Sequence, residues 1–264
     1  MNREGIAKIP RDLIKRQCDD LGDSVLHNLT PQSLSILIVI LAHRNKDSGF
    51  AQVGARRIAK LAGVGINSIS PAVNDLKELC LIRVEKRRKS RNWQEVNRYH
   101  SPYLSTGFFT IGQSVIFGGH WARLSDSARR LYLLMRERCA ENAFSYDPEA
   151  LAYVMGDDYD HTNFYGESDE LLCTTQANLI CQHLKWYRKK FKRAEQTLID
   201  AGLLRRVDIG HDDDSCYDEN GQLIQDAWAV TYRGLDYLEK FLKRIGQTGK
   251  EAGQKIVEIG TIAM

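Results

Sequence analysis

One stretch of the sequence limits the fold more than any other, because it specifies two short helices and the turn that joins them. Residues 55–62 place Ile58 and Leu61 on one side of a helix. Gly63 follows, and glycine readily adopts the positive φ that a tight turn between helices requires. A second helix is predicted over 68–79, and its apolar side chains recur every three or four residues, at Ile69, Val73, Leu76 and Leu79. The chain is therefore expected to hold two helices packed across a glycine turn.

The flanking segments complete a small module. A further helix is expected before the pair, starting at a Thr30 or Ser33 cap, and a short strand follows at 50–53. After the pair, residues 81–87 and 93–99 are predicted to form the two strands of a hairpin with a polar tip. Helix, strand, helix, turn, helix and hairpin is the order of a winged helix-turn-helix.

The outward-facing residues of this module favour double-stranded DNA as its partner. In such motifs the second helix of the pair enters the major groove and its first residues approach base edges. Here those residues are mostly uncharged donors and acceptors: Asn67, Ser68, Ser70, Asn74 and Lys77. Asparagine can bond adenine through two hydrogen bonds. Phosphate contacts are expected from the helix before the turn and from the basic hairpin, at Arg56, Arg57, Lys86, Arg87, Arg88, Lys89 and Arg91.

The second half of the chain repeats this plan with changes. A helix is predicted over 127–140, and another over about 175–201 that can break near Gln182. A strand over 203–209 and a return strand over 227–232 follow. The cations that we expect to face DNA from this second module are Lys185, Arg188, Lys189, Lys192 and Arg193.

Charge is distributed in blocks, although the net charge is only +3. Residues 55–100 hold eleven Lys or Arg and four Asp or Glu, and residues 183–206 hold eight and two. By contrast, residues 146–172 hold eight acids and residues 207–226 hold seven, with no Lys or Arg in either. Two basic blocks are expected either as two anion-facing surfaces or as solvated helix faces without a partner, and the elements that carry them decide between the two. The acidic second hairpin is repelled by phosphates, so we expect the second module to bind DNA through its basic helix alone. Its hairpin would then face either a protein partner or a second copy of the chain.

A length of 264 residues suits two domains. The predicted class is α+β: mainly α, with small β-hairpins in two tandem winged helix-turn-helix domains. The segment between the modules is too apolar for a free linker and is expected to pack. The expected division is an N-terminal extension (1–29), a first module (30–100), a packed linker (101–120), a second module (121–245) with an acidic insertion (157–172), and a tail (246–264).

Several classes of protein are excluded by composition and by missing motifs. A content of 43% hydrophobic residues argues against a disordered chain, and no apolar run approaches the roughly 20 residues of a membrane helix. Without the apolar core of a signal peptide, we expect a cytoplasmic protein with reduced thiols. Cys80 and Cys139 lie in apolar segments and are expected in the core, and Cys173, Cys181 and His183 fit no common zinc spacing. No nucleotide-binding or catalytic arrangement is found, so no enzyme, cofactor or metal site is predicted.

Three short motifs resemble a known family. Residues 56–64 read R-x-I-A-x-L-A-G-V, and with the N-R-Y of 97–99 they resemble the helix-turn-helix domain of phage and plasmid replication proteins. Residues 124–134 resemble a segment of plasmid replication initiators, which carry two tandem winged helices. The resemblance implies binding to repeated origin sites, homodimers that can repress, and recruitment of host replication proteins. In that family the second module reads the repeat most strongly, and the acidic second hairpin departs from that pattern.

Two other functions remain open from the residues alone. The chain can be a winged-helix transcriptional or partition regulator, since one sequence does not separate an initiator from a regulator. It can also be a protein-interaction scaffold, because winged helices serve that purpose without touching DNA.

Overall fold

The structure is a computed structural model that describes residues 6–15, 24–45, 48–86, 96–101, 107–142, 170–173, 175–207 and 227–231. These residues form helices and three small antiparallel sheets, in agreement with the predicted α+β class. Within these ranges, no helix is both long and apolar enough to span a bilayer.

The first module is built around a buried helix. Its elements are α3 (Pro31–Ala42), β2 (Phe50–Gln52), α4 (Ala55–Ala62), the 3-10 turn η1 (Ile66–Ser68), α5 (Ile69–Glu78), β3 (Arg83–Glu85) and β4 (Arg98–His100). Thr30 caps α3, because its Oγ1 accepts a 3.1 Å hydrogen bond from the Ser33 amide. From Ser33 to Ala42 every residue of α3 is buried. The three strands lie in the order β2-β4-β3, so the last strand of the module is the central one.

The described helices and strands of the second module follow the order of those in the first. They are α8 (Asp126–Asn142), β6 (Glu170–Cys173), α10 (Ala177–His183), α11 (Arg188–Asp200), β7 (Leu204–Val207) and β8 (Ala227–Thr231). Its strands lie in the order β6-β8-β7, so the last strand is again central. Ser125 caps α8 through a 3.3 Å hydrogen bond from the Ala128 amide to its Oγ, as Thr30 caps α3.

From α4 to β3 the two modules correspond position by position, and each counterpart lies 122 residues further along the chain (Gly63 to Lys185). The turn after α4 has Gly63 at φ 67°, and the turn after α10 has Lys185 at φ 52°. After α5 and α11, Cys80 and Gly202 likewise take φ values of 56° and 65°. The hydrogen bonds that close these turns match as well: Val64 to Ala59 and Trp186 to Cys181, then Leu81 to Leu76 and Leu203 to Leu198. One backbone plan is therefore present twice.

The N-terminal segment and the linker form a layer of their own between the modules. Strand β1 (Ile6–Pro10) pairs with β5 (Phe108–Gly112), with Ile6 opposite Gly112 and Pro10 opposite Phe108. The inner face of this pair is buried, at Ala7, Ile9, Phe109 and Ile111. The remaining short helices of this layer are α1 (Asp12–Lys15), α2 (Val25–Asn28), α6 (Gln113–Phe117) and α7 (His120–Arg123). The apolar linker thus packs as a strand and short helices.

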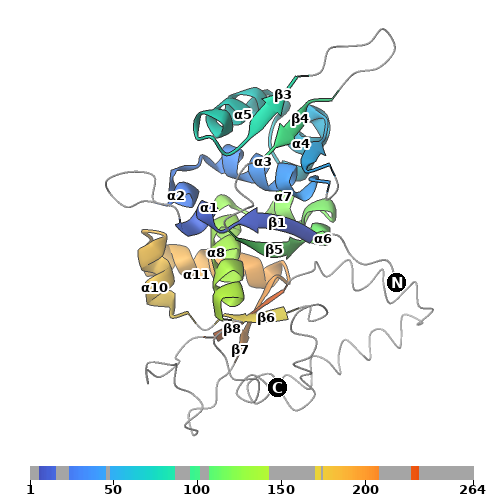
Figure 1. Cartoon of the computed structure of the whole chain (residues 1–264). Helices are drawn as coiled ribbons and strands as arrows, with labels where there is room; N and C mark the ends of the chain where they lie inside the picture. Colours follow the sequence, from blue (N-terminus) through green and yellow to red (C-terminus); the bar gives the residue numbers. More distant parts are fainter. Residues whose placement is uncertain are drawn as a thin grey trace, which may run out of the picture.

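Helix α8 joins the modules. Figure 1 shows it at the centre, with α3, β1 and β5 on one side and α10, α11 and the second sheet on the other. Two of its arginines reach across these neighbours. Arg130 donates to the carbonyl oxygens of Leu26 and Leu29, and Arg136 donates to those of Thr110, at 3.1 Å, and Val230, at 3.3 Å. The side chains of one buried helix therefore tie the N-terminal segment, the linker and the second sheet together.

The structure differs from the sequence predictions in three places. The helix predicted over about 175–201 does break, as two helices, but the chain turns at Lys185, a few residues after the expected position near Gln182. Strand β6 begins at Glu170, within the predicted acidic insertion, because 170–173 pair with the central strand β8. Cys80 is exposed, since it takes the left-handed position that ends α5, whereas Cys139 is buried as predicted. The hairpin tips at 87–95 and 208–226, the insertion at 157–169 and the tail from 232 onward lie outside the described residues.

Candidate nucleic-acid interface

The turn between α4 and α5 is held by side chains from three other helices. The last carbonyl of α4, that of Ala62, accepts hydrogen bonds from Ser35 Oγ at 2.6 Å and from Arg129 Nη2 at 3.1 Å. Trp121 Nε1 in turn donates to Ser35 Oγ at 3.0 Å. The final carbonyls of a helix have no partner within it, so these donors satisfy a group that would otherwise be buried and unpaired. The pair of helices is therefore presented in one fixed orientation.

Gly63 lets this turn lie against the backbone of α7. A Cβ atom at this position would lie 2.3 Å from the Ala122 carbonyl oxygen, which is inside any normal contact distance. The φ of 67° independently disfavours a side chain. Burial lowers the pKa of the neighbouring Arg129 guanidinium, which also donates to the carbonyls of Trp121 and Ala122. Arginine stays protonated at physiological pH even so, and remains a donor at this junction.

The outer face of α5 carries the predicted reading residues. Ser33 Oγ donates to Asp75 Oδ2 at 3.0 Å and so ties α5 to the start of α3. Ser70, Asn74 and Lys77 are exposed on α5, and in the preceding η1 Asn67 is exposed and Ser68 is half-buried. Within the described residues, Asn67, Ser70 and Asn74 have no side-chain hydrogen-bond partner. Their amide and hydroxyl groups are therefore free to meet base edges.

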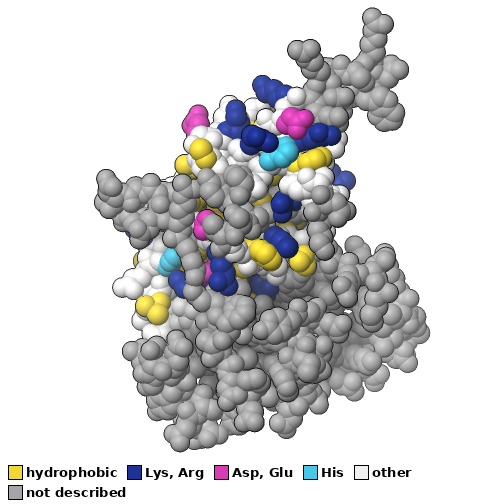
Figure 2. All heavy atoms as spheres, viewed as in Figure 1, with side chains coloured by type: hydrophobic (Ala, Val, Ile, Leu, Met, Phe, Trp, Pro, Cys, Tyr) yellow, Lys and Arg dark blue, Asp and Glu magenta, His cyan; other side chains and the backbone are white. Residues whose placement is uncertain are grey.

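The cations of the first module surround this face. Arg56, Arg57 and Lys60 are exposed on α4, and Lys86 is exposed just after β3. Figure 2 shows Lys and Arg side chains gathered over α5, β3 and β4. Arg87, Arg88, Lys89 and Arg91 of the predicted hairpin tip lie outside the described residues.

A hydrogen bond on α4 and an ion-paired cluster on the sheet orient part of this surface. Arg57 Nε donates to His43 Nε2 at 3.2 Å, and burial, followed by the charge of Arg57, lowers the pKa of His43, which favours the neutral acceptor form. On the sheet, Glu85 lies 3.5 Å from Arg98 and 3.4 Å from His100. The Arg98 guanidinium also lies 4.6 Å from the centre of the Phe50 ring. Glu85 thus partly neutralises the base of the hairpin.

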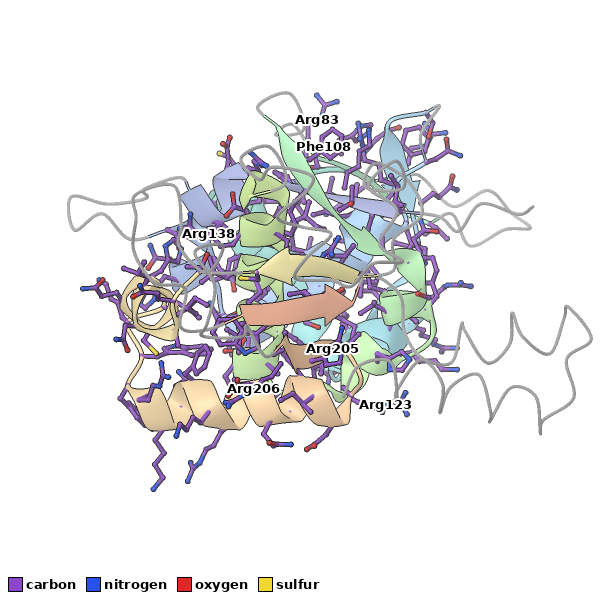
Figure 3. The ribbon with its side chains drawn as sticks, turned by 90° about the horizontal axis from the view of Figure 1, so that it is seen from below. Arg83, Phe108, Arg123, Arg138, Arg205 and Arg206 are labelled. Atoms are coloured by element: carbon purple, nitrogen blue, oxygen red, sulfur yellow. The ribbon has the colours of Figure 1, made fainter. Side chains whose placement is uncertain are left out.

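In the second module the cations lie on α11 instead of on the first helix of the pair. Arg188, Lys189, Lys192 and Arg193 are exposed there, and the labelled view of Figure 3 shows side chains extending outward from this helix. Lys185 is exposed too, but it lies in the turn before α11. The Arg188 guanidinium lies 5.4 Å from the Phe191 ring centre, and Lys190 Nζ lies 4.6 Å from the Trp186 ring.

The sequence reasoning missed a buried acid beneath this basic helix. Glu195 is 2% exposed and accepts hydrogen bonds from Arg206 Nε at 2.9 Å, Arg206 Nη2 at 2.7 Å and Trp228 Nε1 at 2.8 Å. Figure 3 shows Arg205 and Arg206 next to α11. The helical spacing held a signal, because position 195 falls on the buried stripe of Phe191, Ala194 and Leu198. This network joins α11 to the second sheet.

Among the described residues, no group of three or more His, Cys, Asp or Glu is placed to hold a metal ion. Cys173 and Cys181 are buried, and His183 is half-buried at the end of α10. A scan against models of known protein families and a search of curated proteins found no match to this chain.

Proposed function

We propose that this protein binds double-stranded DNA in a sequence-specific manner through two tandem winged helices. The observation that carries the proposal is the outer face of η1 and α5, where exposed and unpartnered Asn67, Ser70 and Asn74 stand beside the arginines of α4. Uncharged amides read base edges, and flanking cations bind phosphates. The repeated order of helices and strands, with the last strand central in both sheets, supports the assignment of a winged helix to each module.

The particular role that we propose is initiation of replication on a plasmid, phage or other mobile element. Its support is the resemblance of residues 56–64, 97–99 and 124–134 to replication initiators. Binding to repeated origin sites, formation of homodimers and recruitment of host replication proteins belong to that role. A transcriptional or partition regulator is the second candidate, because it would present the same reading face.

The experiment is a selection of DNA from a random library and from the source genome with the purified full chain, at two salt concentrations. Enrichment of one motif, with binding that weakens as salt rises, supports the proposal. Tandem copies of that motif beside the gene favour an initiator, whereas a single copy at a promoter favours a regulator. If no motif is enriched and no salt-sensitive retention of DNA is found, DNA binding is rejected. A protein-interaction scaffold is then the remaining function.

A further inference from the structure

The two helix pairs concentrate their cations on opposite members. In the first module Arg56, Arg57 and Lys60 lie on α4 and α5 carries Lys77 alone, and the counterparts of the three α4 cations on α10 are the uncharged Asn178, Leu179 and Gln182. On the second helix of each pair the relation is reversed. Asn67, Ser70 and Pro71 of the first module correspond to Lys189, Lys192 and Arg193 of the second. All of these residues are exposed, so the exchange concerns the surface and not the core.

We propose that the two modules divide the work on one DNA: α5 reads bases, and α11 binds phosphates without reading sequence. This inference rests on the proposed function. It identifies Asn67, Ser70 and Asn74 as the specificity-determining residues, and Lys189, Lys192 and Arg193 as a phosphate-binding surface.

The chemistry of each face supports this division. An asparagine amide offers a donor and an acceptor together, which matches the edge of adenine, and η1 and α5 each expose one such amide, at Asn67 and Asn74. A lysine ammonium is a compact charge on a flexible stem that needs no fixed geometry to bind a phosphate. Five of the first six residues of α11 are cations, interrupted only by the buried Phe191. Such a density of charge suits the closely spaced phosphates of a DNA backbone.

The cations of α11 also differ in the contacts that their side chains make. Arg188 and Lys190 lie over the rings of Phe191 and Trp186. Within the described part of the chain, Lys189, Lys192 and Arg193 pair with no acidic side chain. Glu195, the acid nearest to them in sequence within α11, is turned inward to Arg206 and Trp228 and faces away from that outer surface.

The test compares two combined variants of the full chain on the selected site and on a shuffled site. Changing Asn67, Ser70 and Asn74 to Ala should reduce the preference for the selected site by roughly tenfold or more, with little change on shuffled DNA. Changing Lys189, Lys192 and Arg193 to Ala should weaken binding to both sites by the same factor. It should also lower the slope of log affinity against log salt by about 2.7, since each phosphate contact contributes about 0.9.

Matched controls come from the register between the modules. Arg57→Ala should lower the salt slope by about 0.9, whereas Leu179→Ala, its counterpart on α10, should leave affinity and slope unchanged. A charge-preserving variant, Lys189→Arg with Lys192→Arg and Arg193→Lys, should keep affinity and motif, because phosphate binding depends on charge and base reading depends on geometry.

The division is overturned if the α11 alanine variant changes the selected motif, above all at G·C pairs that Arg and Lys read through guanine. It is also overturned if the charge-preserving variant changes that motif. Either result would leave DNA binding intact and reject only the division of roles. Failure of the unmodified protein to enrich any motif would instead reject the proposed function itself.

Discussion

The two modules share a backbone plan but fill one part of it with opposite chemistry. Between the second helix and the sheet, the first module places Val73, Val84 and Tyr99, all at least partly buried apolar or aromatic residues. The same positions in the second module are Glu195, Arg206 and Trp228, which are joined by hydrogen bonds. The backbone geometry therefore does not require apolar side chains at these positions. It requires only that each buried polar group has a hydrogen-bond partner. A buried carboxylate is tolerated because three donors meet it.

The largest effect is expected from Gly63→Ala, because a Cβ atom would meet the Ala122 carbonyl at a φ of 67°. We expect the free energy of unfolding to fall by about 3 kcal/mol, as overpacking adds to left-handed backbone strain. The counterpart Lys185→Ala should change it little, since a side chain already occupies that position at φ 52°. Chemical denaturation of both variants measures the difference. Equal losses in the two modules would show that the close approach at Ala122 is unimportant.

The next largest effect is expected from Glu195→Val, which installs the residue of the first module at its counterpart in the second. Trp228 Nε1 would lose its acceptor while buried, at a cost of about 2 kcal/mol. Arg206 would contribute less, because its side chain is 65% exposed and can be solvated. The control is Trp228→Phe, alone and combined with Glu195→Val, in a double-mutant cycle. Additive changes within about 0.5 kcal/mol would contradict the coupling.

A smaller and reciprocal effect is expected where α5 and α11 end. Cys80 and Gly202 occupy the same left-handed position, at φ 56° and 65°. Cys80→Gly should raise the free energy of unfolding by up to about 1 kcal/mol, and Gly202→Ala should lower it by about 1 kcal/mol. Both changes are read from thermal unfolding. Opposite signs support the register between the modules, and a loss of stability in both would count against it.

The mildest effect that we expect is on the pH dependence of stability, through His183. His183 occupies the position of Leu61 in the first module. Burial, followed by the charges of Arg138 and His27, lowers the pKa of His183 below its ordinary value of 6.5. The folded protein therefore binds this proton less readily than the unfolded chain, and stability is lost as the pH falls below about 6.5. His183→Leu should reduce that loss, measured as denaturation midpoints between pH 7 and pH 5. An unchanged pH profile would show that His183 does not contribute.

The local parts of the fold could be predicted from the sequence because they depend on neighbours in the chain. The spacing of Ile58, Ile69 and Leu76 places helices correctly, and Gly63 marks the turn between them. The second turn was harder to place, because Lys185 carries no glycine signal, and a break in the helix over about 175–201 was predicted only as an option, near Gln182. The resemblance to replication initiators stays a prediction, as do the DNA contacts of α5 and α11.

The sequence alone fixes the first helix pair, the helical segment over about 175–201, the strands that follow each of them, and the placement of charge along these segments. These features depend on periodicity and on residue type, which are local properties. How these parts meet is visible only in the folded chain. The pairing of β1 with β5 joins segments about 100 residues apart, and Glu195 finds its donors on β7 and β8. Such partners are selected by packing across the whole chain, because a buried polar group is stable only where distant elements satisfy it.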